Sequence, residues 1–171
     1  MASGLRISVY KYMSVDKYKK IFKQKRNYSI GVEEEFMICD PSSGNLIDKA
    51  NDIMNAVCDK DRYSYELLLS EIETNTPICD NVNSAINHLS INRKELRDIG
   101  DKIGYKIGIS GTHPTAMAVD QNFVENSSYN WVAEQLQFYA KRNMTFSTHI
   151  HISVDDPDRA IKITNATRRW I

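Results

Sequence analysis

The chain has 171 residues, of which 42% are hydrophobic, and its 22 acidic and 22 basic residues cancel to a formal net charge of zero. One domain of this length can bury a substantial core, and the balanced charge argues against a nucleic-acid partner. No apolar segment approaches the ~20 residues of a membrane span, so we expect no membrane partner. The three cysteines, Cys39, Cys58 and Cys79, lack zinc-site spacing, and we expect reduced thiols that pack in the core of a cytoplasmic protein.

The first 27 residues are basic, with lysines recurring from Lys11 to Lys25. Apolar residues at helical spacing predict a helix over 14–26. We interpret residues 1–27 as a basic N-terminal extension and residues 28–171 as the domain itself.

The segment 28–40 places three consecutive carboxylates in a run rich in β-branched and aromatic residues, which predicts a strand ending in a turn. Alternation puts Glu33 and Glu35 on one face, and Glu34 on the other face with the aliphatic residues. The Cα atoms of Glu33 and Glu35 would lie about 6.8 Å apart, so both carboxylates could bind the same hard divalent cations. The alternative is a solvated acidic face that keeps an edge strand soluble.

A second acidic face is predicted in the strand 63–76. Its second half alternates Glu71, Glu73 and Asn75 with apolar or β-branched residues. Between the two acidic strands, aliphatic residues at helical spacing predict a short helix over 46–57.

The middle of the chain is predicted to form a long helix, a strand and a loop. Aliphatic residues repeat every three or four positions over 81–103, and Gly104 ends the pattern. Alternation predicts a strand over 105–109. The proline that follows His113 favours an extended backbone, which places His113 on a loop at the strand end. A further helix is predicted over 131–142.

The segment 146–154 alternates aliphatic residues with polar ones, which predicts a strand that carries His149 and His151 on its polar face. Two histidines one strand step apart favour metal or phosphate chemistry, although a structural role is an equal alternative. Pro157 then begins a helix.

Together, these strands predict a site for a hard cation. Carboxylates outnumber imidazoles, which suits Mg²⁺ or Mn²⁺ better than structural zinc. Such ions commonly bridge nucleotide phosphates. The sequence has neither a Walker loop nor a Rossmann glycine fingerprint, so any nucleotide must bind in another way. A metal-dependent hydrolase could use the same cluster but has no further support in the sequence.

Four motifs in order resemble the type 2 glutamate-cysteine ligase family, the YbdK-like carboxylate-amine ligases. The resemblance covers roughly residues 28–171. The motifs are Gly-Val-Glu-Glu-Glu-Phe at 31–36, Glu-Ile-Glu-Thr-Asn-Thr at 71–76, Gly-Thr-His-Pro at 111–114 and Thr-His-Ile-His-Ile at 148–152.

This resemblance implies a glutamine-synthetase-like α+β fold, an antiparallel sheet with helices packed on one face. It also implies ATP as co-substrate and Mg²⁺ or Mn²⁺ as cofactor. The implied reaction forms γ-glutamylcysteine: the γ-carboxylate of glutamate attacks the γ-phosphate of ATP, and the amine of cysteine, or another amine, displaces phosphate from the acyl phosphate. The implied setting is glutathione biosynthesis in the cytoplasm.

Matching the motifs residue by residue implies two sets of site residues, and none of them is assigned as catalytic. The implied metal ligands are Glu33, Glu35, Glu66, Glu73 and His149. The implied substrate or nucleotide contacts are Thr112, His113 and His151.

The chain departs from the family pattern at Thr115, at Ser128 and Tyr129, and at Ser147, where family members typically carry an aromatic residue, an Arg-Tyr pair and a glycine. Family members are also considerably longer, so the chain resembles the N-terminal half of such a ligase. The alternative is a non-catalytic truncated relative or subunit that needs a partner chain. As partner we expect either further copies of this chain in a homo-oligomer or a complementing C-terminal half.

Overall fold

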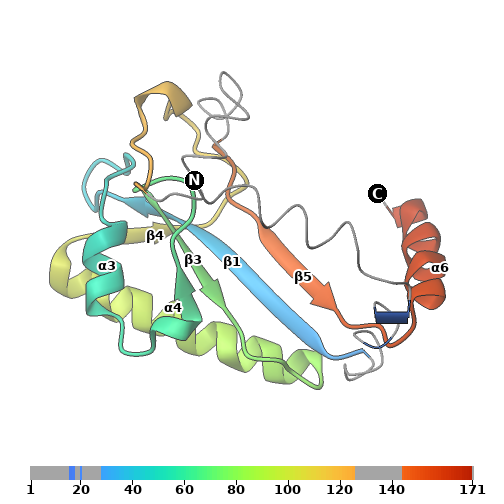
Figure 1. Cartoon of the computed structure of the whole chain (residues 1–171). Coiled ribbons are helices and arrows are strands. Elements are labelled where there is room, and N and C mark those ends of the chain that lie inside the picture. Colours follow the sequence, from blue (N-terminus) through green and yellow to red (C-terminus); the bar gives the residue numbers. More distant parts are fainter. Residues whose placement is uncertain (1–15, 18–19, 21–27, 126–143, 171) are drawn as a thin grey trace, which may run out of the picture. The chain divides into compact units, whose positions relative to one another are not determined.

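The structure is a computed structural model that describes residues 16–17, 20, 28–125 and 144–170 (Figure 1). The chain divides into two compact units: one comprises residues 30–151 and the other contains the two chain ends. The predicted helix over 131–142 lies outside the described residues, and so does most of the helix predicted over 14–26.

The larger unit is organised around β1 (Ile30–Cys39), the longest strand of a five-stranded antiparallel sheet. The other strands are β2 (Tyr63–Ser64), β3 (Glu71–Asn75), β4 (Lys106–Gly108) and β5 (Thr148–Ile152). The order is β2-β3-β1-β4, and β5 also pairs with β1. Figure 1 shows β3 and β5 on either side of β1. Segments far apart in the sequence therefore meet along β1.

Two helices, α3 (Ala50–Ala56) and α4 (Val82–Ile103), cover one face of this sheet (Figure 1). The core between helices and sheet contains Phe36, Ile38, Ala50, Ile53, Val57, Tyr63, Ile72, Leu96, Ile99 and Tyr105. The helix predicted over 81–103 is confirmed almost to the residue, because Asn81 caps its start and Gly104 ends it in the left-handed conformation. The predicted α+β class, with helices on one face of an antiparallel sheet, is confirmed.

Glu34 is the one acid of the β1 triplet on the helix side of the sheet, as predicted. It is buried, and Arg93 of α4 donates two hydrogen bonds to its carboxylate, one of them from Nε at 2.9 Å. A buried charge is tolerated only when it is paired in this way. Glu34 therefore supports the packing of α4 on β1, whereas its two neighbours face the opposite side.

The strand predicted over 63–76 is wrong as a single element, because the chain leaves the sheet between β2 and β3. The departing segment buries Leu67 and Leu68 against Met37 and Phe146 on the face opposite the helices. The break lets both adjacent leucines pack in this one cluster, whereas the alternation of a continuing strand would send them to opposite faces. The helix predicted over 46–57 begins only at Ala50.

The cysteines only partly follow the prediction. All three are free thiols; Cys79 is buried, Cys39 is half-buried and Cys58 is exposed, so a core position is wrong for Cys58. Cys58 follows the end of α3, where its N–H donates to Glu95 on the protein surface.

The smaller unit contains α6 (Pro157–Thr167), which begins as predicted, with Asp156 capping the helix and Pro157 in its first turn. Short 3-10 helices occur in both units: η1 (Lys60–Arg62) and η2 (Ala118–Asp120) in the larger unit and η4 (Arg168–Trp170) in the smaller one. None of the helices among the described residues has the length and apolar character required to cross a membrane.

Candidate metal centre

The two predicted acidic strands lie side by side with their carboxylates on one face. In the antiparallel register of β1 and β3, Glu35 lies opposite Glu73, and Met37 lies opposite Glu71. Directly opposed residues of neighbouring strands point to the same side of a sheet. Glu66 joins them from the loop between β2 and β3, on the wall of a pocket of about 230 Å³ that Glu35 and Glu71 also line.

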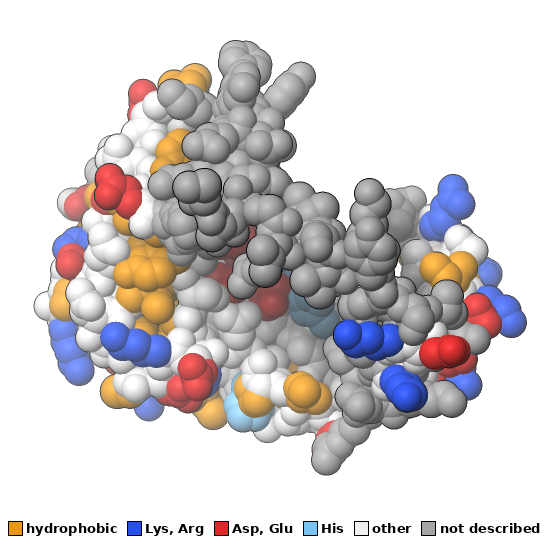
Figure 2. Space-filling view, in the orientation of Figure 1, with side chains coloured by type: hydrophobic (Ala, Val, Ile, Leu, Met, Phe, Trp, Pro, Cys, Tyr) orange, Lys and Arg blue, Asp and Glu red, His pale blue; other side chains and the backbone are white. Residues whose placement is uncertain are grey.

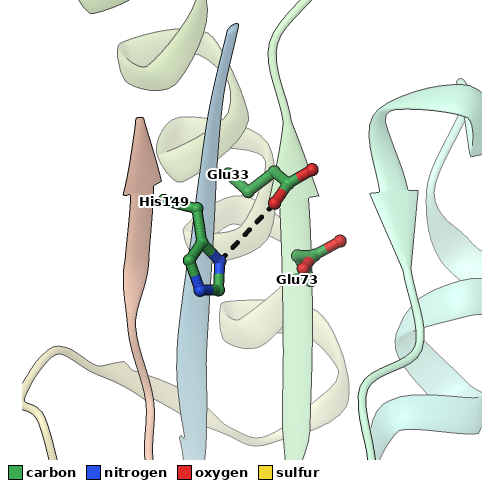
Figure 3. A group of neighbouring side chains, drawn as sticks. All are labelled: Glu33, Glu73 and His149. Carbon is green, nitrogen blue, oxygen red and sulfur yellow. Dashed lines mark ion pairs between the residues drawn. The ribbon is translucent and has the colours of Figure 1, made fainter. Parts of the chain in front are cut away.

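Within the described residues, the carboxylates and one imidazole form two groups of three whose ligand atoms lie within 4.8 Å of one another. Glu33, Glu73 and His149 make one group; Figure 3 shows their side chains converging from neighbouring strands. Glu35, Glu66 and Glu73 make the other group. Glu73 belongs to both. The five residues predicted as metal ligands are thus brought together by the fold.

The two histidines of β5 reach the acidic face of β1 differently. His149 Nδ1 lies 3.5 Å from Glu33 Oε2 and 3.7 Å from Glu35 Oε1, whereas His151 Nε2 lies 3.0 Å from Glu33 Oε2. Acidic side chains and a histidine side chain are visible together toward the centre of Figure 2. Among the described acids, His151 therefore contacts Glu33 at the outer end of the row, whereas His149 lies between Glu33 and Glu35.

The carboxylates are crowded enough to change their protonation. Burial, and after it the charges of Glu35, Glu66 and Glu73, together raise the pKa of Glu71 to about 9. Burial also raises the pKa of Glu66, together with the charges of Glu35 and Glu73. This raised pKa favours the protonated form of the Glu71 carboxyl at neutral pH when no metal is bound.

This donor set fits a hard divalent cation. Glu35 and Glu71 are buried, and Oε1 of Glu71 has no hydrogen-bond partner among the residues that the structure describes. Like charges that face each other across a sheet destabilise it, and a buried polar atom without a partner costs free energy. A dication bound to carboxylate oxygens offsets both costs, and oxygen ligands with one imidazole suit Mg²⁺ or Mn²⁺. The residues predicted for such an ion therefore match its chemistry.

The structure adds Ser147 and Glu71 to the site. Ser147 donates to Glu35 Oε2 from its N–H at 2.6 Å and from its hydroxyl at 2.7 Å, and its hydroxyl lies 3.3 Å from His149 Nε2. The sequence placed Ser147 on the polar face of the strand predicted over 146–154, but Ser147 stood out there only as a departure from the family glycine; it immediately precedes β5. Glu71 was recognised as part of an acidic strand and was not selected as a site residue.

The loop residues Thr112 and His113 do not join this cluster in the described contacts. His113 is buried: Nε2 lies 2.9 Å from the carbonyl oxygen of Gly44, and Nδ1 accepts from the N–H of Ala116 at 3.0 Å. The hydroxyl of Thr112 donates to the carbonyl of Met144. These contacts make His113 a brace between two loops. The predicted substrate role of both residues stays a prediction.

Comparison with known protein families gives one clear match. The family described as glutamate-cysteine ligase family 2 matches residues 29–171.

Curated relatives carry corresponding names. A relative from Rubrobacter xylanophilus, named "Putative glutamate--cysteine ligase 2-1", is 35% identical over 81% of this chain and 37% of its own length. A relative from Haloquadratum walsbyi, named "Glutamate--cysteine ligase", is 35% identical over 84% of this chain and 41% of its own length. The chain therefore spans about two fifths of the length of these relatives.

Proposed function

Because the chain belongs to glutamate-cysteine ligase family 2, we propose that it provides the metal-binding part of an ATP-dependent carboxylate-amine ligase. The observation that carries the proposal is the carboxylate of Glu73, which is shared by two groups of potential ligands on neighbouring strands. A shared carboxylate can bridge two cations, and paired cations suit the transfer of a phosphoryl group.

In the proposed reaction, an oxygen of the γ-carboxylate of glutamate attacks the γ-phosphorus of ATP, and the bond to the leaving ADP breaks. The nitrogen of an amine, with cysteine as the family's acceptor, then attacks the acyl carbon and releases phosphate and a proton. Bound Mg²⁺ or Mn²⁺ would neutralise charge on the transferring phosphoryl group. Glu33, Glu35, Glu66, Glu73 and His149 would hold these ions, and His151 would contact nucleotide or substrate at the outer end of the row.

One observation favours a second candidate, a subunit that completes its site with a partner chain. Every residue of β5 is exposed, including the apolar side chain of Ile150, which is 66% exposed. An exposed strand with an apolar side chain is a surface on which another chain can pack. In this candidate, the carboxylates still bind the cation.

The test is calorimetric titration of Mg²⁺-ATP into the purified chain and into the double variant Glu33→Gln, Glu35→Gln. The matched control is Asp98→Asn, Asp101→Asn, which removes two charges from the exposed surface of α4. The proposal requires binding that the site variant loses and the control keeps. A folded wild-type chain that binds neither Mg²⁺-ATP nor Mn²⁺ contradicts it.

A second assay distinguishes the two candidates. Release of ADP that requires both glutamate and an amine supports a ligase that is active in this chain. Binding of Mg²⁺-ATP without such release supports the subunit that needs a partner.

A further inference from the structure

Glu73 is held from one side by two polar residues that the metal groups do not include. The hydroxyl of Ser64 donates to Glu73 Oε1 at 2.6 Å. The side-chain amide of Asn75 donates to the same oxygen at 3.3 Å and to the Ser64 hydroxyl at 2.9 Å. In the described part of the chain, the hydrogen bonds to the Glu73 carboxylate fall on Oε1, so Oε2 keeps its capacity to bind a cation.

The contact between Ser64 and Glu73 follows from the register of the sheet. Ser64 of β2 lies opposite Glu73, and Glu73 lies opposite Glu35 of β1, so these three residues form a row across three strands. β2 contains only two residues, Tyr63 and Ser64. Tyr63 fills the core beneath the helices, whereas Ser64 is turned to the acidic face. Ser64, the polar residue of this two-residue strand, therefore donates a hydrogen bond to Glu73.

Asn75 is itself anchored to the long helix. Asn92 of α4 is completely buried, and its side-chain amide donates to the backbone carbonyl of Asn75 at 3.1 Å. The guanidinium of Arg62 donates to the side-chain oxygen of Asn92 at 2.8 Å, which fixes the orientation of that amide. The end of β3 that carries Asn75 is thus tied to the packed core, and the side chain of Asn75 begins from a fixed backbone.

We propose that Ser64 and Asn75 are positioning residues that clamp one oxygen of Glu73 so that its other oxygen can serve both metal groups. Outer partners of this kind orient a ligand before the ion arrives, and their loss typically weakens metal binding about 10- to 100-fold. The inference rests on the metal site of the proposed function. It does not require that the chain ligate glutamate or bind ATP.

The test measures Mn²⁺ binding to the whole chain by the electron paramagnetic resonance signal of free Mn²⁺. Ser64→Ala removes the donor, Ser64→Thr keeps a hydroxyl, and Glu73→Gln removes the charge of the ligand. The matched control is Ser90→Ala, because the Ser90 hydroxyl donates to the carbonyl of Ile86 within its own helix. We expect Ser64→Ala to weaken Mn²⁺ binding about tenfold, Ser64→Thr to restore most of it and Ser90→Ala to leave it unchanged.

The thermal unfolding temperature measured without metal shows whether Ser64 positions Glu73 or instead stabilises the fold. The inference requires that Ser64→Ala unfold close to the wild-type temperature while it loses Mn²⁺ affinity. If Ser64→Ala does not fold, Asn75→Ala is measured in the same way, since the backbone carbonyl that Asn92 binds remains.

Three outcomes overturn the inference in distinguishable ways. Wild-type Mn²⁺ affinity in Ser64→Ala, together with lost binding in Glu73→Gln, rejects the clamp and leaves the proposed metal site intact. Lost affinity that Ser64→Thr does not restore shows that the hydroxyl is not the cause. Mn²⁺ binding that Glu73→Gln leaves unchanged rejects both the clamp and the proposed site.

Discussion

Glu35 and Glu73 lie directly opposite each other on neighbouring antiparallel strands, with their carboxylates on the same face of the sheet. A fold selected for stability alone would avoid this pairing, because like charges in directly opposed positions repel. Both carboxylates belong to the group that Glu66 completes. The arrangement becomes favourable when a cation binds between them.

The first prediction concerns this repulsion. Glu35→Gln removes one of the two facing charges but keeps an oxygen that can accept from Ser147. We expect the metal-free variant to be more stable than wild type by about 0.5 kcal/mol in urea unfolding. The stabilisation that Mn²⁺ adds should shrink in the same variant. If Mn²⁺ adds as much stability to the variant as it adds to wild type, Glu35 does not bind the ion.

The second prediction separates the two histidines of β5. His149→Ala should weaken Mn²⁺ binding by at least about tenfold, because His149 belongs to a potential ligand group. His151→Ala should have a smaller effect on Mn²⁺, because the acid that His151 contacts among the described residues is Glu33 and His151 belongs to neither group of potential ligands. The control is His88→Ala on α4, and the measurement is titration of Mn²⁺ by calorimetry. Equal losses for the two β5 variants would contradict the assignment.

The third prediction concerns the buried acid on the helix side. Arg93→Ala leaves the carboxylate of Glu34 buried without its cation, so we expect a loss of about 3 kcal/mol in the free energy of unfolding. Arg97→Ala is the matched control, because the ion pair of Arg97 is with its exposed neighbour Asp98 on the same helix. The control should change stability by no more than about 0.5 kcal/mol. Urea unfolding of the two variants measures the difference.

The fourth prediction concerns acid stability. Burial by itself would raise the pKa of Glu95, but hydrogen bonds from the N–H of Cys58 and the hydroxyl of Tyr63, and the guanidinium of Arg62, outweigh it and lower the pKa below its ordinary value. A carboxyl whose pKa is lowered by folding stabilises the protein fully above its unfolded-state pKa. That contribution disappears as the pH falls through the folded-state pKa.

Glu95→Gln should therefore lower stability near pH 7 by about 2 kcal/mol, since it weakens hydrogen bonds to a charged acceptor, and the difference from wild type should shrink as the pH falls below 4. Thermal unfolding across this pH range measures it. A difference that stays constant down to pH 2 would show that the charge of Glu95 does not contribute.

Local patterns predicted most of the elements and the sides on which their residues lie. Alternation placed Glu33 and Glu35 opposite the side of Glu34, and it placed His149 on the polar face of its strand, because side-chain direction in a strand depends only on position along it. The long helix was predictable for a similar reason, since its apolar spacing and its cap residues are local signals. The prediction over 63–76 failed because burial of Leu67 against the opposite face outweighed local strand propensity.

The sequence by itself determined the family, the presence of acidic strand faces and the identity of the residues that could bind a cation. Only the tertiary structure decided that Glu73 is shared by two groups, that Glu66 reaches one of these groups from a loop, and that Ser64 donates a hydrogen bond to Glu73. These relationships depend on the register between strands and on the path of the loop that leaves the sheet. Register is set by hydrogen bonds and packing between residues distant in the sequence, and local periodicity carries no information about them.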